Sequence, residues 1–288
     1  MIYTNKTLAS ALLFALILCS ISKGISQETT NRSVFDYDNY ADVLEIFVND
    51  KGMVDYKGLK NNPKKLYSFV NDLSRLESER YENWAKKQKI AFWLNAYNGL
   101  TLKVIIENHP IKSSWTKSLI YPKNSIRQID GVWDEITHNV MGQELTLEHI
   151  EHEILRKEFN EPRIHMALVC AAMGCPPLHR EPYVGTELDS QFNEQAREFL
   201  NNPKKFKLVR SKNSVYLSPI FKWFAEDFAE KYGHKGKVDG KSKEKSAIIH
   251  FITQYLSRDQ QRYLLNGTYR IKYLDYDWSL NEQQGVNA

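Results

Sequence analysis

Cysteine is scarce in this 288-residue chain: there are three, and one of them, Cys19, lies in a leader-like stretch at the start. A fold held together by several disulfides is therefore excluded. The sequence also lacks a glycine-rich phosphate loop, a Gly-x-Ser-x-Gly turn and a His-Glu-x-x-His pair. Nucleotide binding, serine-hydrolase activity and zincin activity therefore have no supporting motif.

A strong charge of one sign is also missing. The formal net charge of +4 includes Lys6 and Lys23 of the leader-like stretch, so the remainder carries only +2. Such a weak charge, without a basic stripe, argues against nucleic acid as a partner. With 42% hydrophobic and 12% aromatic residues, the chain has enough apolar side chains for a sizeable core.

The first 26 residues are typical of a secretory signal peptide. Lys6 precedes an apolar run from Leu8 to Leu18, and small residues follow up to Ser26. The run is short for a membrane span, so we expect cleavage before Gln27 or, with an almost equal fit, after Ser22, and export to a periplasmic or secreted location. An uncleaved N-terminal anchor is the alternative. No later stretch is long and apolar enough to span a membrane, and an exported compartment permits disulfides.

Helical spacing dominates the rest of the chain. The pattern predicts helices over residues 37–47, 64–76, 84–107, 147–159, 188–201 and 247–256, and a further helix beginning at Ser218-Pro219. Strands are expected at 54–56, at 164–170, as a hairpin over 207–217, and at 269–276, with a strand or extended loop at 123–134 and a hairpin turn at 141–144. Without regular β–α alternation, this mixture favours an α+β fold, with helices packed on a small, mostly antiparallel sheet.

The segment from Arg163 to Leu178 contains most of the candidate reactive side chains. An apolar run ends at Cys170, and a small-residue loop then presents Cys175 between Gly174 and two prolines. Prolines stiffen a loop, so Cys175 can be held in one orientation, as a nucleophilic thiol requires. A Cys170–Cys175 disulfide and a structural or metal-binding role remain open alternatives.

Two histidines and two amides are the candidate companions of Cys175. His152 lies at the edge of the apolar stripe of its predicted helix, where it can reach a cleft and act as a base, although a structural histidine fits equally well. Asn95 and Asn98 lie within a helix that is apolar nearly all round, so both amides must be hydrogen-bonded in the interior. We expect at least one of them to face the 164–175 segment.

A metal site is the weaker alternative, and no cofactor is expected. The donors nearest in sequence are His165, Cys170, Cys175 and His179. Their spacing matches none of the compact zinc-binding patterns. Inside an apolar run, His165 also suits a satisfied core histidine.

Several segments together resemble one family, the domain of unknown function numbered 547, in its single-domain exported bacterial form. They are Ala91–Asn98, Leu147–Leu155, Arg163–Leu178, Leu217–Phe224 with Asp227-Phe228, and Tyr276–Asn281. The resemblance implies a core domain over residues 84–281, between a helical lead-in at 27–83 and a tail at 282–288. It implies little about activity. The family usually has Gly and Ser or Lys where this chain has residues 171–174, which weakens any role for a loop hydroxyl.

Two functions of different classes fit these observations. The first is a Cys-dependent hydrolase or acyltransferase acting on a small-molecule or peptide substrate, with Cys175 as nucleophile, His152 as base, and Asn95 or Asn98 orienting the site. The set resembles that of papain-like and transglutaminase-like enzymes by analogy only. The second is a non-catalytic exported binding domain in which the Cys, His and Asn side chains form a structural network.

Overall fold

The helix that the sequence makes apolar on every side, α6 (Lys86–Asn108), lies at the centre of the N-terminal half. The computed structural model describes residues 35–284, so the predicted leader at 1–26 lies outside the described residues. Side chains from Ile90 to Ile106 of α6 are buried almost without interruption. A helix buried on all sides needs partners all round, and several short helices supply them. They are α2 (Asp38–Phe47), α3 (Tyr56–Asn61), α4 (Lys64–Arg75) and α5 (Ser78–Glu82).

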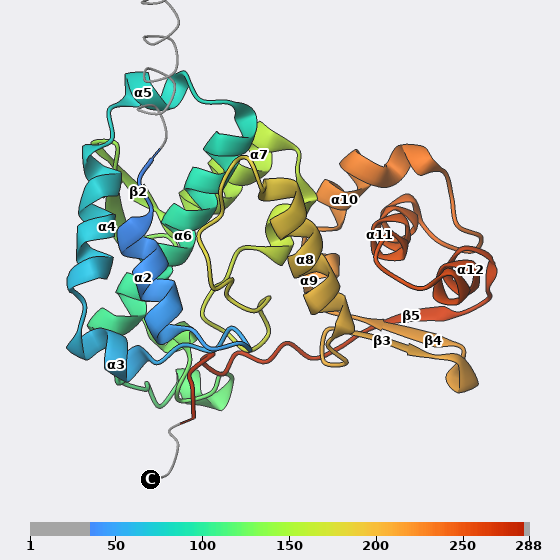
Figure 1. Cartoon of the computed structure of the whole chain (residues 1–288). Coiled ribbons are helices and arrows are strands. Elements are labelled where there is room, and N and C mark those ends of the chain that lie inside the picture. The colour runs from blue at the N-terminus through green and yellow to red at the C-terminus, as the bar shows by residue number, and fades with distance from the viewer. Residues whose placement is uncertain (1–34, 285–288) are drawn as a thin grey trace, which may run out of the picture.

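The segment after α6 adds a hairpin and an unusual helix to this half (Figure 1). Strands β1 (Thr137–Val140) and β2 (Gln143–Thr146) pair antiparallel around a turn in which Met141 and Gly142 have positive φ. The chain then enters a π-helix, η3 (His149–Arg156), continued by one turn, α7 (Lys157–Phe159). Two short 3-10 helices, η1 (Lys117–Leu119) and η2 (Ile126–Gln128), precede the hairpin. We call the apolar interior of this half the larger core.

The C-terminal half has its own apolar interior, which we call the smaller core. A three-stranded sheet has the order β3-β4-β5, with β3 and β4 antiparallel and β4 and β5 parallel. Helices lie beside it, α10 and α11 against each other. The elements are β3 (Phe206–Val209), η5 (Arg210–Lys212), β4 (Ser214–Leu217), α9 (Ile220–Trp223), α10 (Ala225–Tyr232), η6 (Gly233–Lys235), α11 (Lys243–Thr253), α12 (Arg258–Asn266) and β5 (Arg270–Tyr273).

Two segments join the halves. Helix α8 (Leu188–Asn201) contributes Phe192 to the larger core and Phe199 to the smaller one. After β5, the last described residues run back beneath the N-terminal half, the red trace in Figure 1. There Glu282 forms an isolated bridge with Val54, 228 positions earlier in the chain. This return segment brings residues 276–278 beside the loop that carries the thiols.

The α+β class is confirmed, but the strands form two small separate sheets rather than one. The helices predicted at 37–47, 64–76, 84–107 and 188–201 are present within two residues at each end. The 207–217 hairpin is also present, and the 269–276 strand is shorter than expected. The helix predicted at 247–256 begins earlier and ends at Thr253.

The strand expected over residues 164–170 was wrong. This segment is a 3-10 helix, η4 (Pro162–Met166), followed by irregular backbone. Its next backbone groups pair with a side chain instead of a neighbouring strand: Asn98 donates to the carbonyl of Ala167 and accepts from the N–H of Val169. An apolar run without a helical or strand period does not show whether the segment is a buried strand or, as here, a buried 3-10 helix followed by irregular backbone.

A smaller strand prediction was also wrong. At residues 54–56, only Val54 makes isolated bridges, and Tyr56 already begins α3 because the Asp55 carboxylate accepts from the N–H of Gly58. Residues 123–134, expected as a strand or an extended loop, form a loop of bends and turns that contains η2.

Candidate functional site

The loop that carries both cysteines is held by the return segment. The N–H of Met173 donates to the carbonyl of Ser279 at 2.7 Å, and the N–H of Gly174 donates to that of Asp277 at 2.7 Å. A Cβ on Gly174 would lie 2.5 Å from the ring of Tyr276. Only glycine therefore allows Tyr276 to press against the loop, which explains the small residue beside Cys175.

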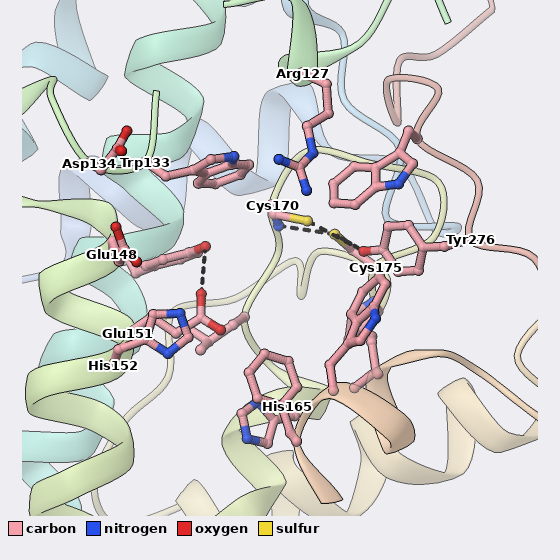
Figure 2. A pocket seen from close by; sticks show the side chains of 17 residues that line it. Arg127, Trp133, Asp134, Glu148, Glu151, His152, His165, Cys170, Cys175 and Tyr276 are labelled. Carbon is pink, nitrogen blue, oxygen red and sulfur yellow. Dashed lines mark hydrogen bonds between the residues drawn. The ribbon is translucent and has the colours of Figure 1, made fainter. Parts of the chain in front are cut away.

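The two thiols meet at one hydroxyl. The oxygen of Tyr276 lies 3.1 Å from the sulfur of Cys175 and 3.4 Å from that of Cys170 (Figure 2). The backbone N–H of Cys170 also donates to the Cys175 sulfur at 3.0 Å. Both cysteines are free thiols in this structure. Cys175 is thus surrounded by donors, which favour a thiolate.

The pKa values of the two thiols are shifted in opposite directions. Burial alone would raise the pKa of Cys175, but side-chain hydrogen bonds from Cys170 and Tyr276 oppose it. With a backbone hydrogen bond at Ala172 and the charge of Lys205, they lower that pKa to about 7. The hydrogen bond to Cys175, together with burial, raises the pKa of Cys170 well above its ordinary value. A proton shared by this pair therefore resides on Cys170, and Cys175 is the thiol that ionises first.

Lys205 lies behind the loop as a buried cation. Its ammonium group donates to the carbonyl of Met173, and it is only 5% exposed. Burial lowers the pKa of Lys205 to about 8, although the two nearby thiols act in the opposite direction. A positive charge held this close favours a negative sulfur at Cys175.

The thiols face a cavity of about 510 Å³ at the junction of the two halves (Figure 2). In Figure 2, the sulfurs and Tyr276 lie on one side of the cavity, and Glu148, Glu151 and His152 lie on the other. Aromatic rings supply much of the lining. The lining residues are Tyr97, Arg127, Trp133, Asp134, Glu148, Glu151, His152, His165, Leu168, Cys170, Cys175, Pro176, Ile220, Trp223, Phe224, Tyr276 and Trp278.

A polar chain crosses between the two halves beneath this cavity. Arg156 makes a two-pronged ion pair with Asp227, with contacts of 2.7 and 2.8 Å, and also contacts Nδ1 of His152 at 2.8 Å. Since a guanidinium only donates, Nδ1 of His152 accepts, and the ring proton of a neutral His152 is on Nε2. Asp227 also contacts Nε2 of His165 at 2.7 Å.

At the centre of this polar chain, the pKa values of Asp227 and His165 are shifted. Burial would raise the pKa of Asp227, but Arg156 and His165 hold it well below its ordinary value. The ring of His165 stacks on Phe224 at a centroid distance of 3.8 Å, and burial lowers its pKa despite the partner carboxylate. His165 is thus a buried histidine satisfied by Asp227, even though it lines the cavity.

Comparison with known families gives a match over part of this chain. Residues 81–200 match the family described as "Protein of unknown function, DUF547". Residues 81–200 form a DUF547 domain. No curated protein and no solved structure matches the chain, so the parallel with papain-like and transglutaminase-like enzymes rests on residue types alone. Among residues 35–284, no helix combines the length and apolarity that a membrane crossing requires.

The DUF547 domain contains all four residues predicted to form a catalytic site, of which two line the cavity and two do not. Cys175 and His152 line the same cavity, without a direct hydrogen bond between them. Asn95 and Asn98 lie in the interior, as expected. Asn98 pairs with the thiol-bearing segment, whereas Asn95 donates to the carbonyl of Tyr183 and accepts from its N–H, both at 2.8 Å. Both amides therefore position backbone and do not line the cavity.

The weaker metal alternative has no geometric support. Within residues 35–284, no group of three or more His, Cys, Asp or Glu side chains is arranged to hold a metal ion. Of the four residues named for it, His165 is bonded to Asp227, and His179 lines a different pocket with Arg180 and Glu194. The four residues are therefore close in sequence but are not gathered at one site in the structure.

Sequence reasoning missed several residues of the site. Tyr276, Trp278, Trp223 and Asp227 lie beyond the DUF547 match at residue 200, and Arg127 lies within it. A signal for the first four was present, because the segments 217–224, 227–228 and 276–281 are among those that resemble the family. The residue types of Tyr276, Trp278 and Trp223 alone suggested no role, since aromatic side chains are ordinary core residues.

Proposed function

We propose that this protein is an exported Cys-dependent hydrolase or acyltransferase, with Cys175 as the nucleophile. One observation carries the proposal. The sulfur of Cys175 faces a cavity of about 510 Å³, and hydrogen bonds from Tyr276 and Cys170 lower its pKa to about 7. A thiolate present near neutral pH beside a cavity suits acyl transfer.

The reaction proceeds in two halves. The Cys175 thiolate attacks the acyl carbon, a sulfur–carbon bond forms, and the bond from that carbon to the leaving oxygen or nitrogen breaks. The leaving group departs with a proton from the enzyme or from water. Water, or an amine, then attacks the thioester, loses a proton to a base, and releases the acyl product with the thiol regenerated.

His152 is the base for the second half. Its Nδ1 is occupied by Arg156, so in the neutral ring Nε2 carries the proton and the ring is fixed in one orientation. In the resting structure the donors to Cys175 are Cys170 and Tyr276, not a histidine. We therefore assign His152 to proton transfer from water in the second half, for which Nδ1 must first release the N–H of Arg156. Asn95 and Asn98 are positioning residues.

The first experiment measures the acidity of Cys175. Alkylation by iodoacetamide is followed from pH 5 to 9 on the native protein, and mass spectrometry identifies the labelled cysteine. We expect Cys175 to react first, with a midpoint near pH 7. Tyr276→Phe removes one donor and should move the midpoint upward, with little change in the rate at high pH. Cys175→Ser is the control for site identity.

The second experiment measures turnover with p-nitrophenyl acetate. Release of one equivalent of p-nitrophenolate in a burst, absent in Cys175→Ser, would support acylation of the thiol. His152→Ala should keep the burst and slow the later steady rate by about 100-fold, the usual contribution of a general base. Absence of a burst, or labelling only after a reductant, would leave the non-catalytic binding domain as the better hypothesis.

Export is the separate part of the proposal. It rests on the charged start, the short apolar run and the small residues before Gln27. N-terminal sequencing of the protein from its native cells should find a start close to residue 27. A start at Met1 would contradict cleavage.

A further inference from the structure

Arg127 is a cation in the cavity lining that makes no ion pair with a described carboxylate. It belongs to η2, and in Figure 2 its guanidinium extends into the cavity. Its Nε is buried and has no hydrogen-bond partner, and among the described residues no carboxylate pairs with the side chain. The positive charge of Arg127 therefore has no described carboxylate to balance it, and an anion bound in the cavity would supply that partner.

This orphaned donor differs from the others in the described part of the chain. The remaining buried side-chain atoms without partners are on Trp84, His138, Tyr183 and Tyr263, and none of these residues lines the cavity. Arg127 alone combines a permanent positive charge, a missing partner and access to the cavity.

Ring contacts connect Arg127 to the thiols. The guanidinium carbon lies 4.3 Å from the ring centroid of Trp278, and Trp278 lies 4.6 Å from the ring of Tyr276. The hydroxyl of Tyr276 touches both sulfurs. The guanidinium lies over the Trp278 ring, and a planar guanidinium without a carboxylate partner can form two parallel hydrogen bonds to a planar anion.

The charges around the cavity select the kind of anion. Among its described lining residues, Arg127 is the only lysine or arginine, whereas Asp134, Glu148 and Glu151 are acidic. One guanidinium neutralises a single negative charge, and the carboxylates would repel a second. A carboxylate therefore fits better than a phosphate dianion. The aromatic lining, with Trp133, Trp223 and Trp278, suits an apolar body attached to that carboxylate.

We propose that Arg127 binds a carboxylate group of the substrate, so that the cavity takes carboxylate-bearing acyl compounds with an apolar or aromatic portion. This inference rests on the proposed function for the reaction at Cys175, but the binding of a carboxylate can be measured independently of any reaction.

The first test is binding. Benzoate and its neutral analogue benzamide are titrated against the protein, with tryptophan fluorescence as the readout because three tryptophans line the cavity. Benzoate should bind at least 10-fold more tightly than benzamide. Arg127→Gln should remove this preference, and Arg127→Lys should keep part of it. Lys123→Gln, which removes a nearby exposed charge outside the cavity, should change nothing. Thermal unfolding checks that each variant folds.

The second test places the carboxylate near the thiol. The rate ratio of iodoacetate to iodoacetamide at Cys175 is compared with the ratio for N-acetylcysteine. The ratio at Cys175 should be about 10-fold higher than the ratio for N-acetylcysteine. In Arg127→Gln the two ratios should be equal.

The outcomes separate the two proposals. Equal binding of benzoate and benzamide, benzoate binding that Arg127→Gln leaves unchanged, or tighter binding of inorganic phosphate than of benzoate would each overturn the carboxylate assignment, even if Cys175 reacts as proposed. If benzoate binds through Arg127 but p-nitrophenyl acetate gives no burst, the binding site stands and the acyl-transfer function fails.

Discussion

The two apolar cores of this protein handle polar groups differently. The larger core, around α6, encloses the amides of Asn95 and Asn98, each of which pairs with the backbone of a distant segment. The smaller core is closed by strands and helices, and its buried polar residues include hydroxyl groups that cap local backbone, such as Ser218 and Ser246. Long-range polar contacts thus fix irregular segments in one half, while regular pairing does so in the other.

The difference explains why the site lies where it does. Irregular backbone can place side chains at angles that helices and strands do not allow, but its N–H and C=O groups still need partners. Asn98 supplies them for the thiol-bearing segment, and the return segment at 277–279 supplies them for the loop. Asp227 then joins α10 of the smaller core to Arg156 of the larger one.

The largest effect should come from breaking that junction. Asp227→Ala leaves His165 without its partner and Arg156 without its carboxylate. We expect a loss of about 2–4 kcal/mol in the free energy of unfolding, below the usual cost for fully buried pairs because Asp227 keeps 19% side-chain exposure. Urea unfolding at pH 7 measures it. Asp259→Ala, which breaks an exposed pair with Arg210, is the control and should cost under about 1 kcal/mol.

The same junction should be sensitive to acid. Because the pKa of Asp227 is held below its ordinary value of 3.8, its stabilising contribution is present above that pH and is lost as the pH falls further. The Asp227→Ala variant should therefore lose less stability than the native protein between pH 4 and pH 2. Parallel acid curves for the two proteins would contradict the assignment.

The next effect compares the two buried amides. Asn98→Leu and Asn95→Leu each orphan one backbone N–H and one carbonyl, so each should cost about 1–3 kcal/mol. Only Asn98→Leu should also alter the iodoacetamide reactivity of Cys175, since of these two amides only Asn98 bonds the thiol-bearing segment. Equal changes in reactivity would show that both amides act only through general stability.

The effect that is smallest at pH 7 should be a gain in stability. His138 is buried in the larger core, its Nε2 has no partner, and burial, with the charge of Lys103, lowers its pKa to about 4. His138→Leu should stabilise the protein by about 1 kcal/mol at pH 7. Since the unfolded chain binds a proton at His138 below about pH 6.5 and the folded chain does not, native stability falls with acid. The advantage should therefore grow by about 2 kcal/mol at pH 5. Urea unfolding at both pH values measures it, and a constant gap would contradict the low pKa.

Much of the helical part of the fold was predictable from local pattern. The α6 and α8 stretches have apolar positions that agree with a helix over several turns, and they end near where the pattern ends. The 164–170 segment was not predictable, because its apolar residues are buried by their surroundings and its backbone partner is Asn98, 69 positions away from Ala167. The pattern also gave no sign that η3 would be a π-helix.

For the candidate site too, some features were predictable from the sequence and others were not. The sequence by itself determined that Cys175 sits in a stiff loop, that Asn95 and Asn98 must be bonded in the interior, and that His152 lies at the border of an apolar stripe. These depend on neighbours along the chain. Only the tertiary structure decided that Tyr276 reaches both sulfurs, that Asp227 satisfies His165, and that Arg127 is left without a partner. Such contacts join residues 62 to more than 100 positions apart, and their acidities follow from burial and donors that exist only after the two cores have met.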